Sequence, residues 1–248
     1  MPSFPSARVI NLDRSPQRWE AIAARLGALG SPFERVAGVD GRAEPERCAA
    51  ACDQRAVEAY MRRPLINGEI ACALGHLEIW RSLAETDEEM FLVLEDDADF
   101  DESLLVLPDL IAALPDDWEI LLLSTKGRQP LWSKTVGEHE VVRYHRPATF
   151  AIGYVIHRRL LAKRREWDQP VRFAFDMWRF WAWRHGLVLY ASNPRLVHHL
   201  QDQKSTISGS ETRVTARPGL VTILRGALLR LGLYPRAWWQ RRTVRRGL

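Results

Sequence analysis

Acidic residues gather at the end of one apolar stretch, "MFLVLEDDADFD" at 90–101. The apolar run 90–94 predicts a buried strand, and it leads directly into five carboxylates: Glu95, Asp96, Asp97, Asp99 and Asp101. Carboxylates this close repel one another unless a cation or water relieves them. Their oxygen atoms suit Mg²⁺ or Mn²⁺, which often bridge protein carboxylates to substrate phosphates. The pattern favours a metal site on a rigid strand, and the alternative is a solvated acidic loop.

The direction of these side chains depends on whether the strand continues. Side chains alternate along an extended chain, so Glu95, Asp97 and Asp99 are expected on one side and Asp96 on the other.

A β-α-β unit at the start of the chain is expected to position the acidic segment. The stretch 7–12 is an apolar strand, 13–30 is a helix and 33–41 is a second strand that closes in a turn. Ser15 is the expected cap of the helix, and Pro16 suits its first turn. Ligands of open α/β sheets bind beyond the carboxyl ends of strands, so "NLDRS" and "EDDAD" should face one crevice.

Helices and strands alternate through the rest of the body, which is an α/β pattern. Asn67 is the expected cap of the helix that follows it, and Pro108 should interrupt another helix. The expected helices cover 44–62, 68–85, 101–114, 157–166 and 175–185, and the expected strands cover 118–124, 137–145, 149–157 and 187–192, with a polar loop from 193.

The composition is that of a folded protein with an ample core: 248 residues, 46% hydrophobic and 27% charged. The first residues do not resemble a secretory signal, and no apolar run is long enough to span a membrane, so a cytoplasmic protein is expected. Cys48, Cys52 and Cys72 are interpreted as small buried residues of a reducing compartment rather than as metal or redox groups.

Positive charge is concentrated in the last 31 residues. The segment 218–248 has seven arginines and no acid, so the net charge of +4 leaves about −3 for a domain at 1–217. The tail also carries Trp238 and Trp239 and an apolar helical face, which suits the anionic inner face of a membrane. An ordinary C-terminal helix packed on the body is the alternative. Because the body is acidic, nucleic acid is not an expected partner.

Four blocks in order resemble glycosyltransferase family 25, the group of bacterial lipooligosaccharide galactosyltransferases and related collagen galactosyltransferases. The blocks are "VINLDRSPQRWEAIAARL", "FERVAGVDG", "GEIACALGHLEIW" and "FLVLEDDA", and the likeness continues more weakly at 153–163, 173–178 and 194–199. The resemblance implies a GT-A-like fold, with a mixed, mainly parallel sheet flanked by helices. It also implies a UDP-sugar donor and a divalent metal, Mn²⁺ or Mg²⁺, held by an acidic motif of the DxD type.

The resemblance also implies roles for individual residues. Glu95-Asp96-Asp97 matches the acidic motif, with Asp97 as the metal contact and His199 as a second metal ligand, or His198 in its place. The implied donor-binding residues are Asn11, Arg14, Arg18, Asp40, His76 and Asp96. Simpler interpretations remain open: Arg18 as a helix-surface charge, Asp40 as a turn residue and His76 as a core histidine.

Two positions depart from the family pattern, which reads Gly-Cys-x-x-Ser-His where this chain has "ACALGH". Ala71 replaces a glycine, and Gly75 replaces the serine before His76. If that hydroxyl contacts the donor or acceptor, this protein lacks the contact.

Sugar transfer with inversion requires a base that accepts the proton of the acceptor hydroxyl. Asp176 in "FAFDMWRFW" is the candidate base, because partial burial among aromatic residues would raise its pKa, and Glu95 is the second candidate catalytic residue. Asp176 could instead cap the helix that begins there. One of Trp178, Trp181 and Trp183 could line an acceptor groove, although packing into the core is the commoner outcome.

The sequence thus predicts a metal-dependent transfer of a hexose, galactose by the resemblance, from a UDP-sugar to a glycan acceptor. A lipid-linked acceptor such as the lipooligosaccharide or lipopolysaccharide core fits the basic tail. Two alternatives remain open: a metal-dependent nucleotidyltransferase or phosphohydrolase, and a non-catalytic family member that only binds the donor.

Overall fold

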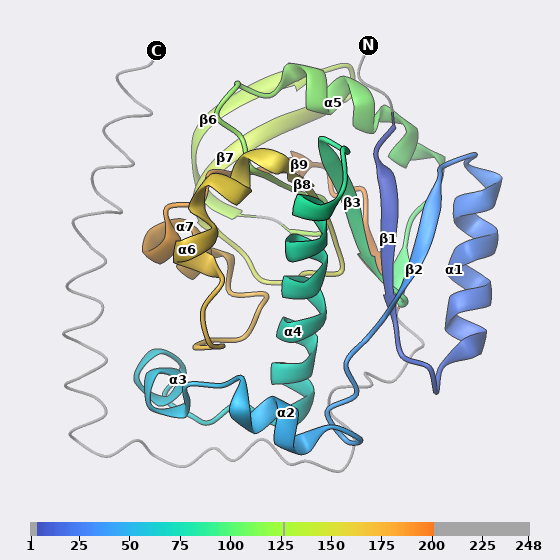
Figure 1. Cartoon of the computed structure of the whole chain (residues 1–248). Coiled ribbons are helices and arrows are strands. Elements are labelled where there is room, and N and C mark those ends of the chain that lie inside the picture. The colour runs from blue at the N-terminus through green and yellow to red at the C-terminus, as the bar shows by residue number, and fades with distance from the viewer. Residues whose placement is uncertain (1–3, 126, 201–248) are drawn as a thin grey trace.

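The computed structural model describes residues 4–125 and 127–200, and a mixed eight-stranded sheet lies at its centre (Figure 1). The strand order is β2-β1-β3-β8-β5-β9-β7-β6. The strands are β1 Ser6–Asn11, β2 Phe33–Ala37, β3 Met90–Glu95, β5 Ile120–Leu122, β6 Gly127–Val136, β7 His139–Pro147, β8 Gly153–His157 and β9 Leu189–Asn193. Helices flank this sheet, so the predicted mixed α/β class is confirmed.

The pairing of the first strands brings two carboxyl ends together. β1 runs parallel to both β2 and β3, and β3 runs antiparallel to β8. On the far side, β5 is parallel to β9, while β7 is antiparallel to both β9 and β6. A separate two-stranded sheet pairs β4 Ala98–Asp99 with β10 His198–His199.

Two cores lie on opposite faces of the main sheet. The α4-side core holds α4 Asn67–Ser82 with α3 Gln54–Met61 and α7 Trp178–His185, and Figure 1 shows α4 lying across this face. The α1-side core holds α1 Pro16–Ala28 and α5 Leu107–Ala113. β3 serves both faces, because Phe91 and Val93 enter the first core while Leu92 and Leu94 enter the second, as the period of two requires.

The predicted β-α-β unit at the start of the chain is confirmed. α1 begins after Ser15 with Pro16 in its first turn. The Ser15 side chain makes no capping hydrogen bond, but the Ser15 carbonyl accepts one from the Asn11 amide at 2.9 Å. This bond ties the start of α1 to the end of β1.

Several helix boundaries differ from the prediction. The expected helix at 44–62 divides into α2 Pro45–Ala50 and α3, because the Asp53 side chain accepts from the Ala56 N–H and starts a new helix. Asn67 is not the cap of α4. Ile66 occupies that position, and the Glu69 carboxylate accepts the Ile66 N–H at 3.2 Å. The predicted interruption at Pro108 is confirmed, since a 3₁₀ turn, η2 Glu102–Val106, precedes α5.

The segment expected as one helix at 157–166 is also divided. It consists of a 3₁₀ segment, η3 Arg158–Lys163, followed by the short α6 Arg164–Trp167.

The strands β6 and β10 were not predicted. Among the described residues β6 is an edge strand that pairs only with β7. Its side chains are exposed or half-buried, and the register shifts between Pro130 and Trp132. A strand of this kind carries no regular alternation of apolar residues. β10 has two residues, which is too short for any periodic signal.

Aromatic side chains fill the α4-side core around Trp80. Its ring contacts Trp167, Phe175 and Trp181 at centroid distances of 5.1–5.4 Å. Trp178 and Trp181 are both buried, so they pack inside the protein rather than line an acceptor groove.

The predictions for 201–217 and for the basic tail 218–248 concern residues outside those that the structure describes. Among residues 4–125 and 127–200, no helix is both long enough and apolar enough to cross a bilayer.

A substitution at Gly41 tests how closely the loop after β2 packs on the start of α4. A Cβ atom built there would lie 2.6 Å from the carbonyl carbon and oxygen of Asn67, which are backbone atoms with little freedom to move. We expect Gly41→Ala to lower the free energy of unfolding by about 1–3 kcal/mol in urea titrations.

The matched control for Gly41→Ala is Gly27→Ala in α1, where nothing lies within 4 Å of a built Cβ. This change should stabilise the protein by about 0.5–1 kcal/mol, because alanine is the better helix former. Equal effects of the two changes would contradict the close packing at Gly41.

Candidate functional site

The carboxyl ends of β1 and β3 lie side by side, and their polar side chains meet. The two strands pair up to Ile10 and Glu95. One residue beyond each, the Asn11 amide nitrogen donates to Asp96 Oδ2 at 2.7 Å. The prediction that these two strand ends face the same crevice is therefore confirmed.

The prediction of alternating sides for the acidic residues is wrong beyond Glu95. The chain turns at Asp96 and Asp97 before β4 begins, so both carboxylates approach the same guanidinium. Arg18 Nη1 lies 3.1 Å from Asp96 Oδ1 and 3.8 Å from Asp97 Oδ2. Asp99 points elsewhere and pairs with Arg25 at 2.8 Å. The turn redirects the chain into the small sheet with β10, which overrides the strand period.

Among the acidic residues at the end of β3, Asp97 lies in the surroundings least favourable to a charged carboxylate. It is buried, and its Oδ1 atom has no hydrogen-bond partner among residues 4–125 and 127–200. Burial raises the pKa of Asp97 to about 6, and the charge of Glu95 adds to the effect, while His199 and Arg18 oppose it. A buried carboxylate oxygen without a donor is the kind of atom that a bound cation satisfies.

His199 lies beside Asp97 because of the small sheet. β10 pairs with β4 so that His199 is opposite Ala98, and the Leu200 N–H donates to the Asp97 carbonyl at 3.1 Å. His199 Nε2 is 3.3 Å from Asp97 Oδ2. His198, the alternative ligand, is opposite Asp99. One carboxylate and one imidazole suit Mn²⁺ or Mg²⁺ when substrate oxygens complete the ligand set, so these residues fit the implied metal.

Asn11 and Arg18 hold Asp96 in place. Asn11 is buried, its amide nitrogen donates to Ser15 and Asp96, and its Oδ1 accepts from Arg35 Nε at 2.8 Å. Arg18 is not a surface charge, because only 14% of its side chain is exposed and it binds Asp96. Asn11 and Arg18 thus act on the site through the carboxylate that they orient.

Arg14 and Asp40 form a more exposed pair at the rim of the same region. Arg14 Nε donates to Asp40 Oδ2 at 2.6 Å, and Asp40 Oδ1 accepts from the Arg42 N–H. Asp40 is therefore both a turn residue and a partner of Arg14, and the two interpretations left open for it are compatible.

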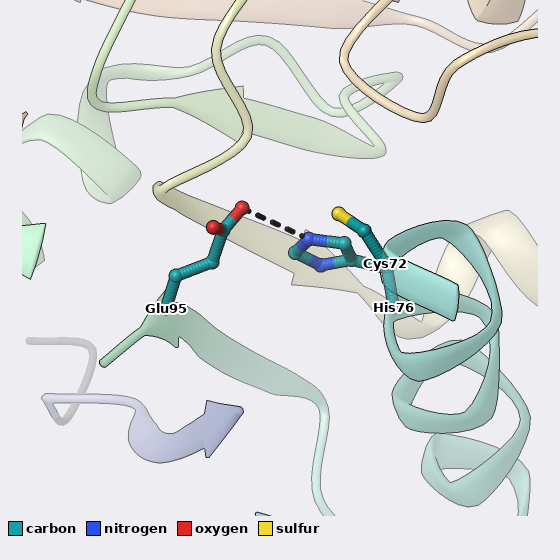
Figure 2. A group of neighbouring side chains, drawn as sticks. All are labelled: Cys72, His76 and Glu95. Carbon is teal, nitrogen blue, oxygen red and sulfur yellow. Dashed lines mark hydrogen bonds and ion pairs between the residues drawn. The ribbon is translucent and has the colours of Figure 1, made fainter. Parts of the chain in front are cut away.

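His76 is a core histidine that contacts the site through Glu95. Glu95 keeps the strand period and points toward α4, where its Oε1 lies 3.2 Å from His76 Nε2 (Figure 2). The imidazole is fully buried, stacks on Phe175 at 4.2 Å and bonds the Tyr154 hydroxyl through Nδ1 at 2.9 Å. His76 thus orients Glu95 from the core, and its Nε2 atom faces the end of β3.

Asp176 contributes to the same negative region. It is half-buried and lies between the buried residues Phe175 and Trp178. The cap of α7 is Met177 rather than Asp176. Burial raises the pKa of the Cys72 thiol well above its ordinary value, and the charges of Glu95, Asp176 and Asp97 add to that rise. The three carboxylates therefore act on one thiol, and the catalytic role of Asp176 stays a prediction.

The two departures from the family pattern lie at packing positions of α4. Ala71 is buried in the α4-side core. A Cβ at Gly75 would lie 3.6 Å from Cγ2 of Ile10, so a serine there would begin in the contact between α4 and β1. Consecutive residues project about 100° apart around a helix, so a serine side chain at position 75 would not point in the same direction as His76.

Sequence reasoning missed three residues of this region. Arg35 lies within the short strand β2, and a charge at a half-buried strand position was the available signal. Cys72 precedes His76 by four residues, a spacing that puts both side chains on one face of a helix. Tyr154 lies in the fully buried strand β8 and gave no separate signal.

Comparisons with known proteins show which family this chain resembles. The family model described as glycosyltransferase family 25 (LPS biosynthesis protein) matches residues 4–163. Procollagen galactosyltransferase 2 of Homo sapiens is 30% identical over 134 residues, covering 51% of this chain and 21% of the human protein. A glycosyltransferase 25 family member of Aedes aegypti is 28% identical over 158 residues, covering 60% of this chain and 26% of that protein.

The chain thus spans about a fifth to a quarter of the length of these curated relatives. A solved glycosyltransferase involved in glycosylation of the major capsid of PBCV-1 aligns with 92% of this chain and 100% of its own. Its TM-score is 0.44 at 8% identity, a likeness too weak to support a conclusion.

The raised pKa of Asp97 predicts the pH dependence of stability without metal. Its carboxyl titrates near 6 in the folded protein and near 3.8 ordinarily, so folding disfavours its ionised form, and stability falls as pH rises between these values. We expect Asp97→Asn to raise the free energy of unfolding above pH 6, by up to about 3 kcal/mol.

The measurement is urea unfolding of chelator-treated protein from pH 4 to pH 8. The gain from Asp97→Asn should shrink toward pH 4, where the carboxyl is protonated in the folded protein and about half protonated in the unfolded chain. A variant less stable than the wild type at pH 8 would show that the contacts with Arg18 and His199 outweigh the cost of burial.

Proposed function

The chain belongs to glycosyltransferase family 25, and we propose that it transfers a hexose from a UDP-sugar to a hydroxyl of a glycan acceptor with inversion. The observation that carries the proposal is the buried Asp97, whose Oδ1 has no partner within the described part of the chain although His199 and Arg18 lie next to Oδ2. A site built to receive a cation and the diphosphate of a nucleotide sugar accounts for such a group.

Galactose is the proposed sugar because two kinds of observation agree. The four sequence blocks resemble a family of galactosyltransferases, and a relative from Homo sapiens is named a procollagen galactosyltransferase. The family description also names LPS biosynthesis, so we propose a lipopolysaccharide-type glycan as the acceptor.

The donor is proposed to lie across the ends of β1 and β3. Asp97 and His199 would hold Mn²⁺ or Mg²⁺, which when bound supplies positive charge for the leaving diphosphate. Arg14 lies at the rim with 36% of its side chain exposed, and its planar guanidinium can pair with phosphate oxygens in place of Asp40. Asn11 and Arg18 hold the Asp96 carboxylate in place, and that carboxylate would in turn orient the donor.

The acceptor hydroxyl must lose its proton as its oxygen attacks the anomeric carbon. We assign that proton to the carboxylate of Asp176, which is half-buried and adds its charge to the region of Glu95 and Asp97. The bond from the anomeric carbon to the diphosphate oxygen breaks as the new glycosidic bond forms on the opposite face. Glu95, which His76 holds at 3.2 Å, would contact the donor sugar or ribose.

A panel of UDP-galactose, UDP-glucose, UDP-GlcNAc and UDP-GalNAc, each with and without Mn²⁺, tests the proposal through UDP release. We expect turnover with UDP-galactose that EDTA abolishes. Asp97→Asn and Asp176→Asn should each lower kcat/KM by about 10²–10⁴. Mn²⁺ with UDP should raise the melting temperature of the wild type but not of Asp97→Asn.

The matched control is Asp99→Asn, two residues away in the same acidic segment. Asp99 is half-exposed and pairs with Arg25 away from the crevice, so its loss should leave kcat/KM near the wild-type value. Full activity in EDTA, or an equal loss in Asp97→Asn and Asp99→Asn, would refute the assignment of the metal to Asp97.

For the basic segment 218–248 we propose contact with the anionic inner face of a bacterial inner membrane, based on its seven arginines and its tryptophans. Deletion of this segment should abolish co-sedimentation with phosphatidylglycerol-containing liposomes at low salt. Unchanged co-sedimentation after deletion would remove the membrane proposal.

A further inference from the structure

Three side chains of different chemistry converge between α4 and the end of β3. Cys72 and His76 lie one helical turn apart on the same face of α4, and both point toward Glu95 (Figure 2). The sulfur, a ring nitrogen and a carboxylate oxygen of these residues all lie within 4.8 Å of one another. From the sequence alone, Cys72 is interpreted as a small buried residue and is not placed beside His76 and Glu95.

We propose that Cys72, His76 and Glu95 bind Zn²⁺ at a position distinct from the Mn²⁺ or Mg²⁺ position at Asp97. Thiolate, imidazole and carboxylate are the usual ligands of Zn²⁺, whereas Mn²⁺ and Mg²⁺ prefer oxygen ligands. Because the three ligand atoms lie within 4.8 Å of one another, small rotations of Cys72 and Glu95 are enough to bring them to the spacing of ligands around one zinc ion. Three protein ligands leave a fourth position for water or a substrate atom.

The surroundings of His76 resemble the support that zinc-bound histidines receive. A histidine that binds a metal through one ring nitrogen usually bonds a fixed partner through the other. Here Nδ1 bonds the Tyr154 hydroxyl at 2.9 Å, the Trp80 N–H also donates to that hydroxyl, and Phe175 stacks on the ring. Because a hydroxyl both donates and accepts, Tyr154 can hold the tautomer in which the Nε2 lone pair faces Glu95 and Cys72.

The local charge also favours a cation over a bare thiolate. Burial raises the pKa of Cys72, and the acidic groups Glu95, Asp176, Asp97 and Glu69 raise it further. Binding would replace the thiol proton by the metal: the S–H bond breaks, the proton passes to water, and the sulfur lone pair binds Zn²⁺. One thiolate and one carboxylate then balance the two charges of the ion.

The ion has a route to its ligands. Cys72 and Glu95 are only half-buried, whereas His76 lies fully buried behind them. The ion can therefore reach the thiol and the carboxylate from solvent, and the imidazole behind them then completes the set of protein ligands.

The test is metal titration of the full-length, chelator-treated protein. We expect one Zn²⁺ per chain in competition with a chromogenic chelator, and a sulfur-to-cobalt charge-transfer absorption when Co²⁺ is used as the probe. Cys72→Ser should abolish that absorption and weaken Zn²⁺ binding at least about tenfold. Glu95→Gln, which leaves every cysteine in place, should weaken Zn²⁺ binding and retain the absorption.

The matched control is Cys52→Ser, because Cys52 is another half-buried cysteine that lies between α2 and α3. It should bind Zn²⁺ and Co²⁺ like the wild type. Unchanged binding in Cys72→Ser, or loss of the absorption in Cys52→Ser, would overturn the proposal.

Asp97→Asn distinguishes the two metal positions. Retained Zn²⁺ binding in this variant supports a separate site, whereas loss in Asp97→Asn without loss in Cys72→Ser would place the zinc at Asp97 and His199 and refute the proposal. None of these measurements requires turnover, so they stand or fail independently of the proposed transferase activity.

Discussion

The structure depends on a charge constraint at the end of β3. Two adjacent carboxylates, Asp96 and Asp97, are buried where a strand leaves the sheet, and such groups are costly unless fixed partners compensate them. The first β-α-β unit supplies those partners: Asn11 from the end of β1, and Arg18 from the first turns of α1. The parallel pairing of β1 with β3 therefore positions the side chains of the acidic site as well as those of the core.

These partners compensate the charge of Asp96 more fully than that of Asp97. Asp96 has a donor on each oxygen, whereas one oxygen of Asp97 has no hydrogen-bond partner among the residues that the structure describes, and burial raises the pKa of Asp97 to about 6. Side chains that are fully satisfied need no ligand, and those that are not gain the most from one. The contrast between these neighbouring residues distinguishes the part of the cluster that supports the site from the part that faces the ligand.

Local sequence patterns predicted the elements on which this arrangement rests. The apolar run at 90–94, the proline in the first turn of α1 and the polar ends of two strands were sufficient to predict that the strand ends share a crevice. The turn at Asp96 and Asp97 was not predictable, because it is stabilised by pairing with β10 about 100 residues later. The position of His199 depends on the same long-range pairing, and the part of α4 that meets Glu95 depends on how the helix packs on the sheet.

The period of the strand explains why one acidic motif can support two kinds of chemistry. Glu95 is the last residue that obeys the alternation of β3, so it points to the α4 side, where the buried imidazole of His76 and the thiol of Cys72 lie. One residue later the chain turns, and Asp97 meets His199 instead. Two carboxylates only two residues apart, Glu95 and Asp97, thus have different surroundings. Glu95 lies beside a thiol and an imidazole, and Asp97 lies beside other carboxylates and the more exposed imidazole of His199. Since metal preference follows ligand type, two positions of different selectivity can lie within one short segment.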